Sequence, residues 1–187
     1  MKIGCGFSIQ WVFVTFVGFL VSLYWIEIGE RTNVGSIEGA IGGAVIGLAQ
    51  WFVIRQTFSQ AGWWIVASII SWGLIGSSNL GALGWVAPAT LQLPIRVVYG
   101  SIYGAVVGTV IGVAQWFVLR KQMAKAWQWI LASALAWAMG LTSGWVVGGV
   151  LRKATGLFLA EVVGLVFVWL VVAAITSIAF YFMARNR

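Results

Sequence analysis

Six long apolar stretches fill almost the whole of this chain, and they limit its fold more than any other feature. They cover residues 7–26, 34–54, 63–86, 97–119, 127–150 and 157–183, separated by short charged or proline-containing connections. A bilayer core about 30 Å thick is crossed by a helix of about 20 residues. Each stretch is expected to be a helix, because an open strand would leave backbone groups unpaired in lipid and the alternation of a membrane barrel is missing. The sequence therefore predicts an all-α integral membrane protein with about six transmembrane helices, forming a single domain over residues 1–187.

The third stretch has a second half that is poor in helix-forming residues. Small and polar residues precede two prolines there, namely Gly76, Ser77, Ser78, Asn79 and Gly81 ahead of Pro88 and Pro94. Such a cluster favours a loop. Two interpretations therefore stay open, a continuous third helix or a shorter helix followed by a loop.

Charged residues make up 8% of the chain and hydrophobic residues 61%. No polar run is long enough for a soluble catalytic or nucleic-acid-binding domain, so the net charge of +7 belongs to loops and tails and sets the topology. The chain has no His, no Asp and a single Cys, which excludes most hydrolytic, haem and zinc chemistry. We therefore expect a protein that is not an enzyme, with no catalytic residue, no metal site and no nucleic-acid partner.

The basic residues divide unequally between the two predicted sides of the membrane. If the N-terminus is cytoplasmic, that side holds seven of them, Lys2, Arg55, Arg120, Lys121, Lys125, Arg185 and Arg187. The opposite side holds four, Arg31, Arg96, Arg152 and Lys153. Because Lys and Arg accumulate in cytoplasmic loops, both termini are expected in the cytoplasm.

A segment of 38 residues occurs twice, with the two copies 65 positions apart. Residues 35–72 and 100–137 are identical at 21 of these positions, which indicates a duplication. Each copy spans two apolar stretches, so each is expected to form a hairpin of two helices. Two crossings return the chain to its starting side, so the hairpins should be parallel and related by an axis along the membrane normal. The first and sixth helices lie outside this tandem repeat.

Glycines recur at every fourth position along the first helix of each copy. They are Gly35, Gly39, Gly43 and Gly47 in one copy and Gly100, Gly104, Gly108 and Gly112 in the other. This spacing places them on one side of a helix, where a second backbone can approach closely, an arrangement called a glycine zipper. We expect the two zippers to pack inside the monomer around the axis between the copies. The alternatives are contact with a second copy of the chain or with another subunit.

Two glutamines lie two helical turns beyond the zippers, Gln50 in one copy and Gln115 in the other. Both amides should point into the bundle, because an amide in hydrocarbon needs hydrogen-bond partners. They are expected to bond to each other or to Ser68 and Ser133, as a clamp between helices. Binding of a substrate is the second interpretation.

The chain contains 13 Trp, and ten of them lie near predicted membrane interfaces. Those ten are expected to form aromatic belts, namely Trp11, Trp25, Trp51, Trp63, Trp64, Trp85, Trp116, Trp127, Trp129 and Trp145. Trp72, Trp137 and Trp169 instead fall near the middle of their helices. They are expected to pack in the core, with a bound lipid, quinone, carotenoid or chlorophyll as the alternative.

Two glutamates lie inside the predicted helices, Glu38 and Glu161, each about one turn from a helix end. Glu38 also departs from the repeat, because its counterpart is Tyr103. A charge in the membrane is costly, so such residues often have a function. We nevertheless expect each to pair at the surface with Arg31, Arg96, Arg152 or Lys153, or to cap a helix N-terminus, and a functional role is the alternative.

The pattern G-x-x-x-G-x-x-Q-W-x-x-x-R, followed by W-I-x-A-S, resembles a group of small bacterial membrane proteins in which cyanobacterial members are prominent. The resemblance covers roughly residues 35–148. It implies a bacterial plasma or thylakoid membrane and carries no activity.

Two functions fit these observations. The first is a non-catalytic scaffold or accessory subunit that packs with another membrane protein, a lipid or a pigment, as a homo-oligomer or within a larger complex. The second is a small channel or transporter with a polar path between the repeats, formed by Glu38, Gln50, Gln115 and Glu161. The first is favoured because packing devices outnumber reactive groups.

Overall fold

The computed structural model describes residues 4–29 and 34–185. Within these ranges the chain is all-helical, with one isolated backbone bridge and no strand. The elements are α1 (Cys5–Ser22), α2 (Ser36–Ile54), α3 (Gly62–Ser77), the short 3-10 helix η1 (Leu83–Trp85), α4 (Leu93–Leu119), α5 (Gln128–Thr155) and α6 (Leu159–Arg185). Four of the helices, α2, α4, α5 and α6, are long and apolar enough to cross a membrane, which suggests a membrane protein. The apolar helices α1 and α3 are shorter.

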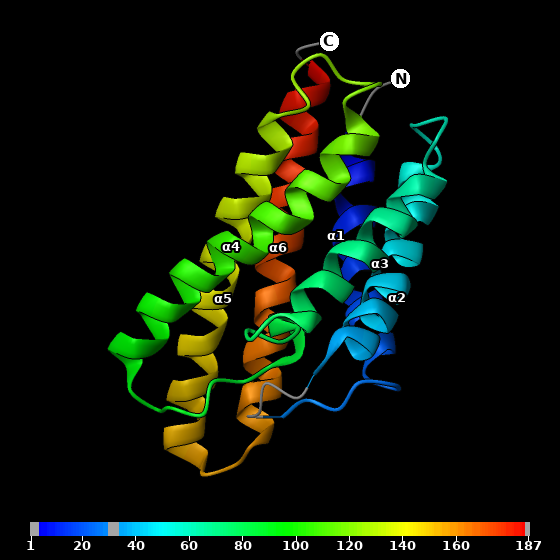
Figure 1. Cartoon of the computed structure of the whole chain (residues 1–187). Coiled ribbons are helices and arrows are strands. Elements are labelled where there is room, and N and C mark those ends of the chain that lie inside the picture. The colour runs from blue at the N-terminus through cyan, green and yellow to red at the C-terminus, as the bar shows by residue number, and fades with distance from the viewer. Residues whose placement is uncertain (1–3, 30–33, 186–187) are drawn as a thin grey trace.

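The helices form one bundle in which consecutive helices run in opposite directions. Figure 1 shows α4, α5 and α6 grouped on one side and α1, α2 and α3 on the other, with the start of α1 and the end of α6 at the same end of the bundle. Helix α6 contacts both α5 and α1, so it joins the two groups. Lys2, Arg31 and Arg187, which belong to the expectations about charge, lie outside the described residues.

The third apolar stretch is not a continuous helix, so the interpretation with a loop is correct. Helix α3 ends at Ser77, and the chain then turns back into the bundle through a segment, residues 81–87, that is buried along its whole length. Gly81 begins this segment with φ of 66°, a left-handed conformation that glycine adopts without strain. We call residues 81–87 the buried loop.

Hydrogen bonds to neighbouring segments fix both ends of the buried loop. The Ala82 amide donates to the Val34 carbonyl oxygen at 3.0 Å, and the Ala87 amide donates to the Gly29 carbonyl oxygen at 3.0 Å. Non-helical backbone is tolerated at membrane depth only where protein or water supplies such partners. The loop therefore replaces the last turns of the expected third helix with an irregular but hydrogen-bonded segment.

Each row of zipper glycines lies against the second helix of its own hairpin. A Cβ atom at Gly43 would collide with the carbonyl oxygen of Ser68 on α3, and one at Gly108 with the carbonyl oxygen of Ser133 on α5. The zippers therefore pack inside the monomer, as expected, but each contacts the second helix of its own hairpin and not the zipper of the other copy. The reason is geometric, because a short turn after α2 and after α4 brings the next helix back along the same face.

The prediction of aromatic belts is wrong for five of the ten tryptophans assigned to them. Trp25, Trp63 and Trp127 are exposed and Trp51 and Trp116 are half-buried, whereas the other five, Trp11, Trp64, Trp85, Trp129 and Trp145, are buried in the bundle. Four of the five buried indoles donate a hydrogen bond to an internal acceptor. Position near a helix end therefore did not reveal which face of the helix each Trp occupies.

Replacing Gly43 or Gly108 with Ala should destabilise the bundle by about 1–3 kcal/mol, because the added Cβ meets a backbone carbonyl that cannot move alone. Gly73→Ala is the matched control, since its Cβ would lie 3.6 Å from the Ala40 Cβ, an ordinary contact. Unfolding of the three variants in mild detergent measures the difference. Equal stability of all three would contradict the close approach of α2 to α3 and of α4 to α5.

Candidate functional site

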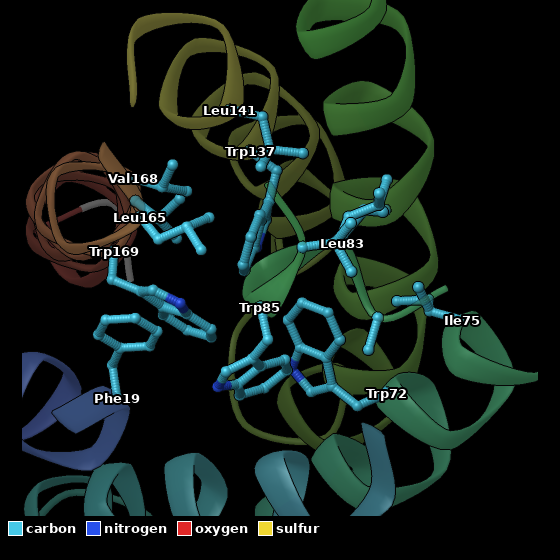
Figure 2. Packing of buried hydrophobic residues seen from close by; sticks show 14 of the residues in the cluster. Phe19, Trp72, Ile75, Leu83, Trp85, Trp137, Leu141, Leu165, Val168 and Trp169 are labelled. Atoms are coloured by element: carbon cyan, nitrogen blue, oxygen red, sulfur yellow. The ribbon is translucent and has the colours of Figure 1, made fainter. Parts of the chain in front are cut away.

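Four tryptophans meet in the middle of the bundle, each from a different element. Trp72 on α3 lies 5.1 Å from Trp137 on α5 between ring centroids, and Trp169 on α6 lies 4.9 Å from Trp137. The buried loop adds Trp85, whose ring lies 4.8 Å from that of Trp72. Figure 2 shows these rings converging, with Phe19 of α1 beside Trp169. The three mid-helix tryptophans therefore pack against one another in the core.

Two hydrogen bonds fix the outer members of this tryptophan cluster. The Trp85 indole donates to the Ser22 hydroxyl at 2.7 Å, and the Trp169 indole donates to the Gly84 carbonyl oxygen at 3.0 Å. Both bonds tie the buried loop to a helix outside the repeat. Gly84 leaves room for the rings, since a Cβ there would lie 2.8 Å from the Trp72 ring.

The glutamines Gln50 and Gln115 are buried, but they do not bond to each other or to the two serines. The Trp64 indole donates to Gln50 Oε1 at 2.9 Å, and the Trp129 indole donates to Gln115 Oε1 at 2.9 Å. Gln50 Nε2 also donates to the Thr15 hydroxyl at 3.1 Å. The expected partners were wrong because Trp64 and Trp129, assigned to a belt by position, face inward.

A small cavity of about 20 Å³ lies at the centre of the bundle. Four pairs of equivalent residues from the two copies contribute to its lining, Ile46 and Ile111, Gln50 and Gln115, Ser68 and Ser133, Trp72 and Trp137. This volume is sufficient for about one water molecule, and far below the roughly 300 Å³ at which small-molecule sites begin. The cavity therefore brings together four of the six candidate ligand residues in a space too small for an organic ligand.

The other two candidate residues, Glu38 and Glu161, lie apart from this cavity. Glu38 Oε2 accepts a hydrogen bond from the Gly35 amide at 3.0 Å, so this carboxylate caps the start of α2. Glu161 pairs with Arg96 through two hydrogen bonds of 2.6 and 2.8 Å. The expected partner is thus present, but the pair is not at the surface, because Arg96 is 0% and Glu161 2% exposed.

All five N–H groups of the Arg96 guanidinium donate a hydrogen bond. Besides Glu161, it donates to the carbonyl oxygens of Pro88, Thr90 and Trp145, at 3.0, 2.6 and 2.6 Å. The pair therefore joins α4, α5, α6 and the segment that follows the buried loop. Full satisfaction of the hydrogen bonds is what makes a buried ion pair tolerable.

Two adjacent glycines on α5 make space for the ion pair. A Cβ at Gly149 would lie 3.0 Å from the Arg96 guanidinium, and one at Gly148 would lie 2.7 Å from Glu161 Oε2. Neither glycine belongs to the zippers. The glycine spacing Gly140, Gly144 and Gly148 was a signal that could have indicated this close packing of α5 on α6.

A large groove lies between α3 and α4, on the outer surface of the bundle. It has a volume of about 780 Å³, within the range of roughly 300–1,000 Å³ typical of sites for small molecules. Its walls are mostly apolar, with Val66, Ile70 and Leu74 on α3 facing Val113 and Phe117 on α4. In Figure 1 these two helices lie next to each other on the side facing the viewer. None of the six candidate ligand residues lines this groove.

No known protein family, curated protein sequence or solved structure matches the chain.

Replacing Glu161 with Gln should cost about 3–5 kcal/mol of stability, because it leaves the Arg96 charge buried without its counterion. Glu27→Gln is the control, since Glu27 is exposed at the same end of the bundle. The double variant Arg96→Met, Glu161→Met should lose less stability than the single variants Arg96→Met and Glu161→Met lose together, which a double-mutant cycle in detergent measures. Additive losses would mean that the two side chains do not interact.

Proposed function

We propose that this protein is a non-catalytic integral membrane scaffold that binds a lipid in the groove between α3 and α4. All six helices lie in the bilayer in this proposal, and both termini are cytoplasmic. The membrane is a bacterial plasma or thylakoid membrane. The groove is the observation that carries the proposal, because it is large, apolar and open on the outer surface of an apolar bundle.

Equivalent contacts in the two copies support a parallel tandem repeat. The Gln50–Trp64 and Gln115–Trp129 hydrogen bonds have the same length of 2.9 Å and the same spacing along the chain. Equivalent rings also touch across the centre, with Trp64 and Trp129 at 5.6 Å. An axis between the two hairpins, running along the bundle, accounts for both observations.

The distribution of charge along the bundle supports the proposed orientation. The described glutamates, Glu27, Glu38 and Glu161, lie at the end where α1 and α5 finish. That end also carries three described basic residues, Arg96, Arg152 and Lys153, whereas the opposite end, where α2, α4 and α6 finish, carries five, Arg55, Arg120, Lys121, Lys125 and Arg185. Because basic residues accumulate on the cytoplasmic side, this end is the cytoplasmic one in the proposal.

The internal packing gives less support to a channel or transporter. The central cavity lies between two layers of touching tryptophans, Trp64 with Trp129 and Trp72 with Trp137. Glu38 caps a helix and Glu161 is held by Arg96, so neither extends this cavity into a path. The scaffold therefore remains the proposal that the geometry favours.

Replacing Val113 with Trp should fill the groove and remove bound lipid from the purified protein. The control is Leu48→Trp, because Leu48 is the equivalent residue of the other copy, is exposed, and does not line the groove. Each protein is extracted in gentle detergent, and its bound lipid is measured by mass spectrometry. Wild type and Leu48→Trp should retain lipid, and Val113→Trp should not. Equal lipid in all three would contradict the proposal. A visible absorption band or a stoichiometric second polypeptide lost only in Val113→Trp would show a pigment or a protein in the groove instead.

Single cysteines should report the proposed orientation in a Cys5→Ser background. Glu27→Cys and Ala89→Cys should react with an impermeant maleimide added to intact cells, because both positions are exposed at the end assigned to the outside. Ser59→Cys and Ala124→Cys, in the turns at the other end, should react only after lysis. The reverse pattern would invert the proposed topology, and labelling at both ends would contradict six crossings.

A further inference from the structure

The groove between α3 and α4 is polar at one end only. Arg120 and Lys121 line it where α4 finishes, together with Gln60 and Trp63 where α3 begins. Further along, the hydroxyls of Ser71 and Thr109 donate to carbonyl oxygens of their own helices. The groove therefore presents two positive charges at one end and apolar surface along the rest.

The length of the groove corresponds to one leaflet of a bilayer. Its lining runs from Trp63 to Leu74 on α3 and from Thr109 to Lys121 on α4. At 1.5 Å per residue these segments are about 17–18 Å long. One leaflet with its head groups is about 20 Å thick, half of a bilayer of about 40–45 Å.

Arg120 is held in place beside the groove by aromatic rings. Its guanidinium carbon lies 4.8 Å from the centre of the Phe117 ring and 5.3 Å from that of Trp116. Stacking on aromatic faces limits the mobility of the guanidinium and leaves its edge N–H groups able to bind phosphate oxygens in pairs. Trp63, 62% exposed, lies at the same end, where an indole suits the level of the head groups.

We propose that the groove selects a phospholipid with an anionic head group, bound with its phosphate at Arg120 and Lys121 and its acyl chains between α3 and α4. The inference rests on the proposed function, since it names the class of lipid that the scaffold holds. Charge complementarity favours an anionic over a zwitterionic lipid, because the two basic side chains lie at the level of one head group. The opposite end of the groove offers no basic side chain among its lining residues.

The repeat supplies a matched control for the charges. Arg55 is the equivalent of Arg120 and stacks in the same way, 4.6 Å from the ring centre of Trp51 and 4.8 Å from that of Phe52. It does not line the groove. Arg55→Gln therefore removes the same charge and the same stacking at the same end of the bundle, but outside the proposed site.

The test uses the full chain reconstituted in vesicles of equal parts phosphatidylglycerol and phosphatidylcholine with identical acyl chains. The protein is extracted into gentle detergent, and the retained lipids are quantified by mass spectrometry. Wild type and Arg55→Gln should retain more phosphatidylglycerol than phosphatidylcholine. The double variant Arg120→Gln, Lys121→Gln should still retain lipid but lose the preference, by about fivefold for each charge removed, since a basic residue near an anionic surface contributes about 1 kcal/mol.

The outcomes separate this inference from the proposed function. If the double variant keeps the wild-type preference while Val113→Trp still loses lipid, the groove binds lipid without selecting its charge and the inference is overturned alone. If Arg55→Gln also loses about fivefold of the preference, the loss expected for one charge removed, the preference comes from the basic end of the bundle as a whole, and the inference also fails. If Val113→Trp retains as much lipid as the wild type, both proposals fail.

Discussion

Helices surrounded by lipid tails gain little from burying apolar side chains against one another, so a bundle in a bilayer depends on close contact and on polar bonds. In this protein the close contact comes from glycine. Gly43 and Gly108 place the backbones of paired helices within touching distance, and Gly144 and Gly164 do the same between α5 and α6. Larger side chains at these positions would separate the helices and remove the dispersion contacts that hold them.

The second support is a set of internal polar bonds that hold an irregular segment inside the bundle. The buried loop carries Trp85 into the core, and Arg96, which is paired with Glu161, fixes the segment that follows the loop. Helices α4, α5 and α6 therefore share one ion pair with that segment. Removal of either charge would leave the other desolvated, so the loop and the three helices are expected to depend on the same interaction.

The cavity inside the bundle and the groove on its surface differ in size and in lining, and this difference bears on function. Inside, the two glutamines that suggested a ligand site bond to Trp64, Trp129 and Thr15 around a cavity of about 20 Å³. Outside, a groove of about 780 Å³ combines apolar walls with two basic side chains at one end. An amphipathic lipid fits the second arrangement, because its acyl chains need apolar surface and its phosphate needs a cation at the level of the head group.

The sequence alone determined the all-helical fold and, except for the end of the third helix, the helix positions to within a few residues, because these follow from local hydropathy. The internal comparison also predicts two equivalent hairpins. The sequence also indicated that Glu161 has a basic partner and left the loop after α3 open as an alternative. It did not reveal that Trp64, Trp85 and Trp129 face inward, that the zippers pack within their own hairpins, or that Arg96 is buried. Those features depend on the rotation of each helix about its axis. In a chain that is apolar on nearly every face, the pattern of residues does not specify that rotation, and only tertiary packing decides it. The groove is likewise a property of two helices from different hairpins, and only their spacing in the folded bundle creates it.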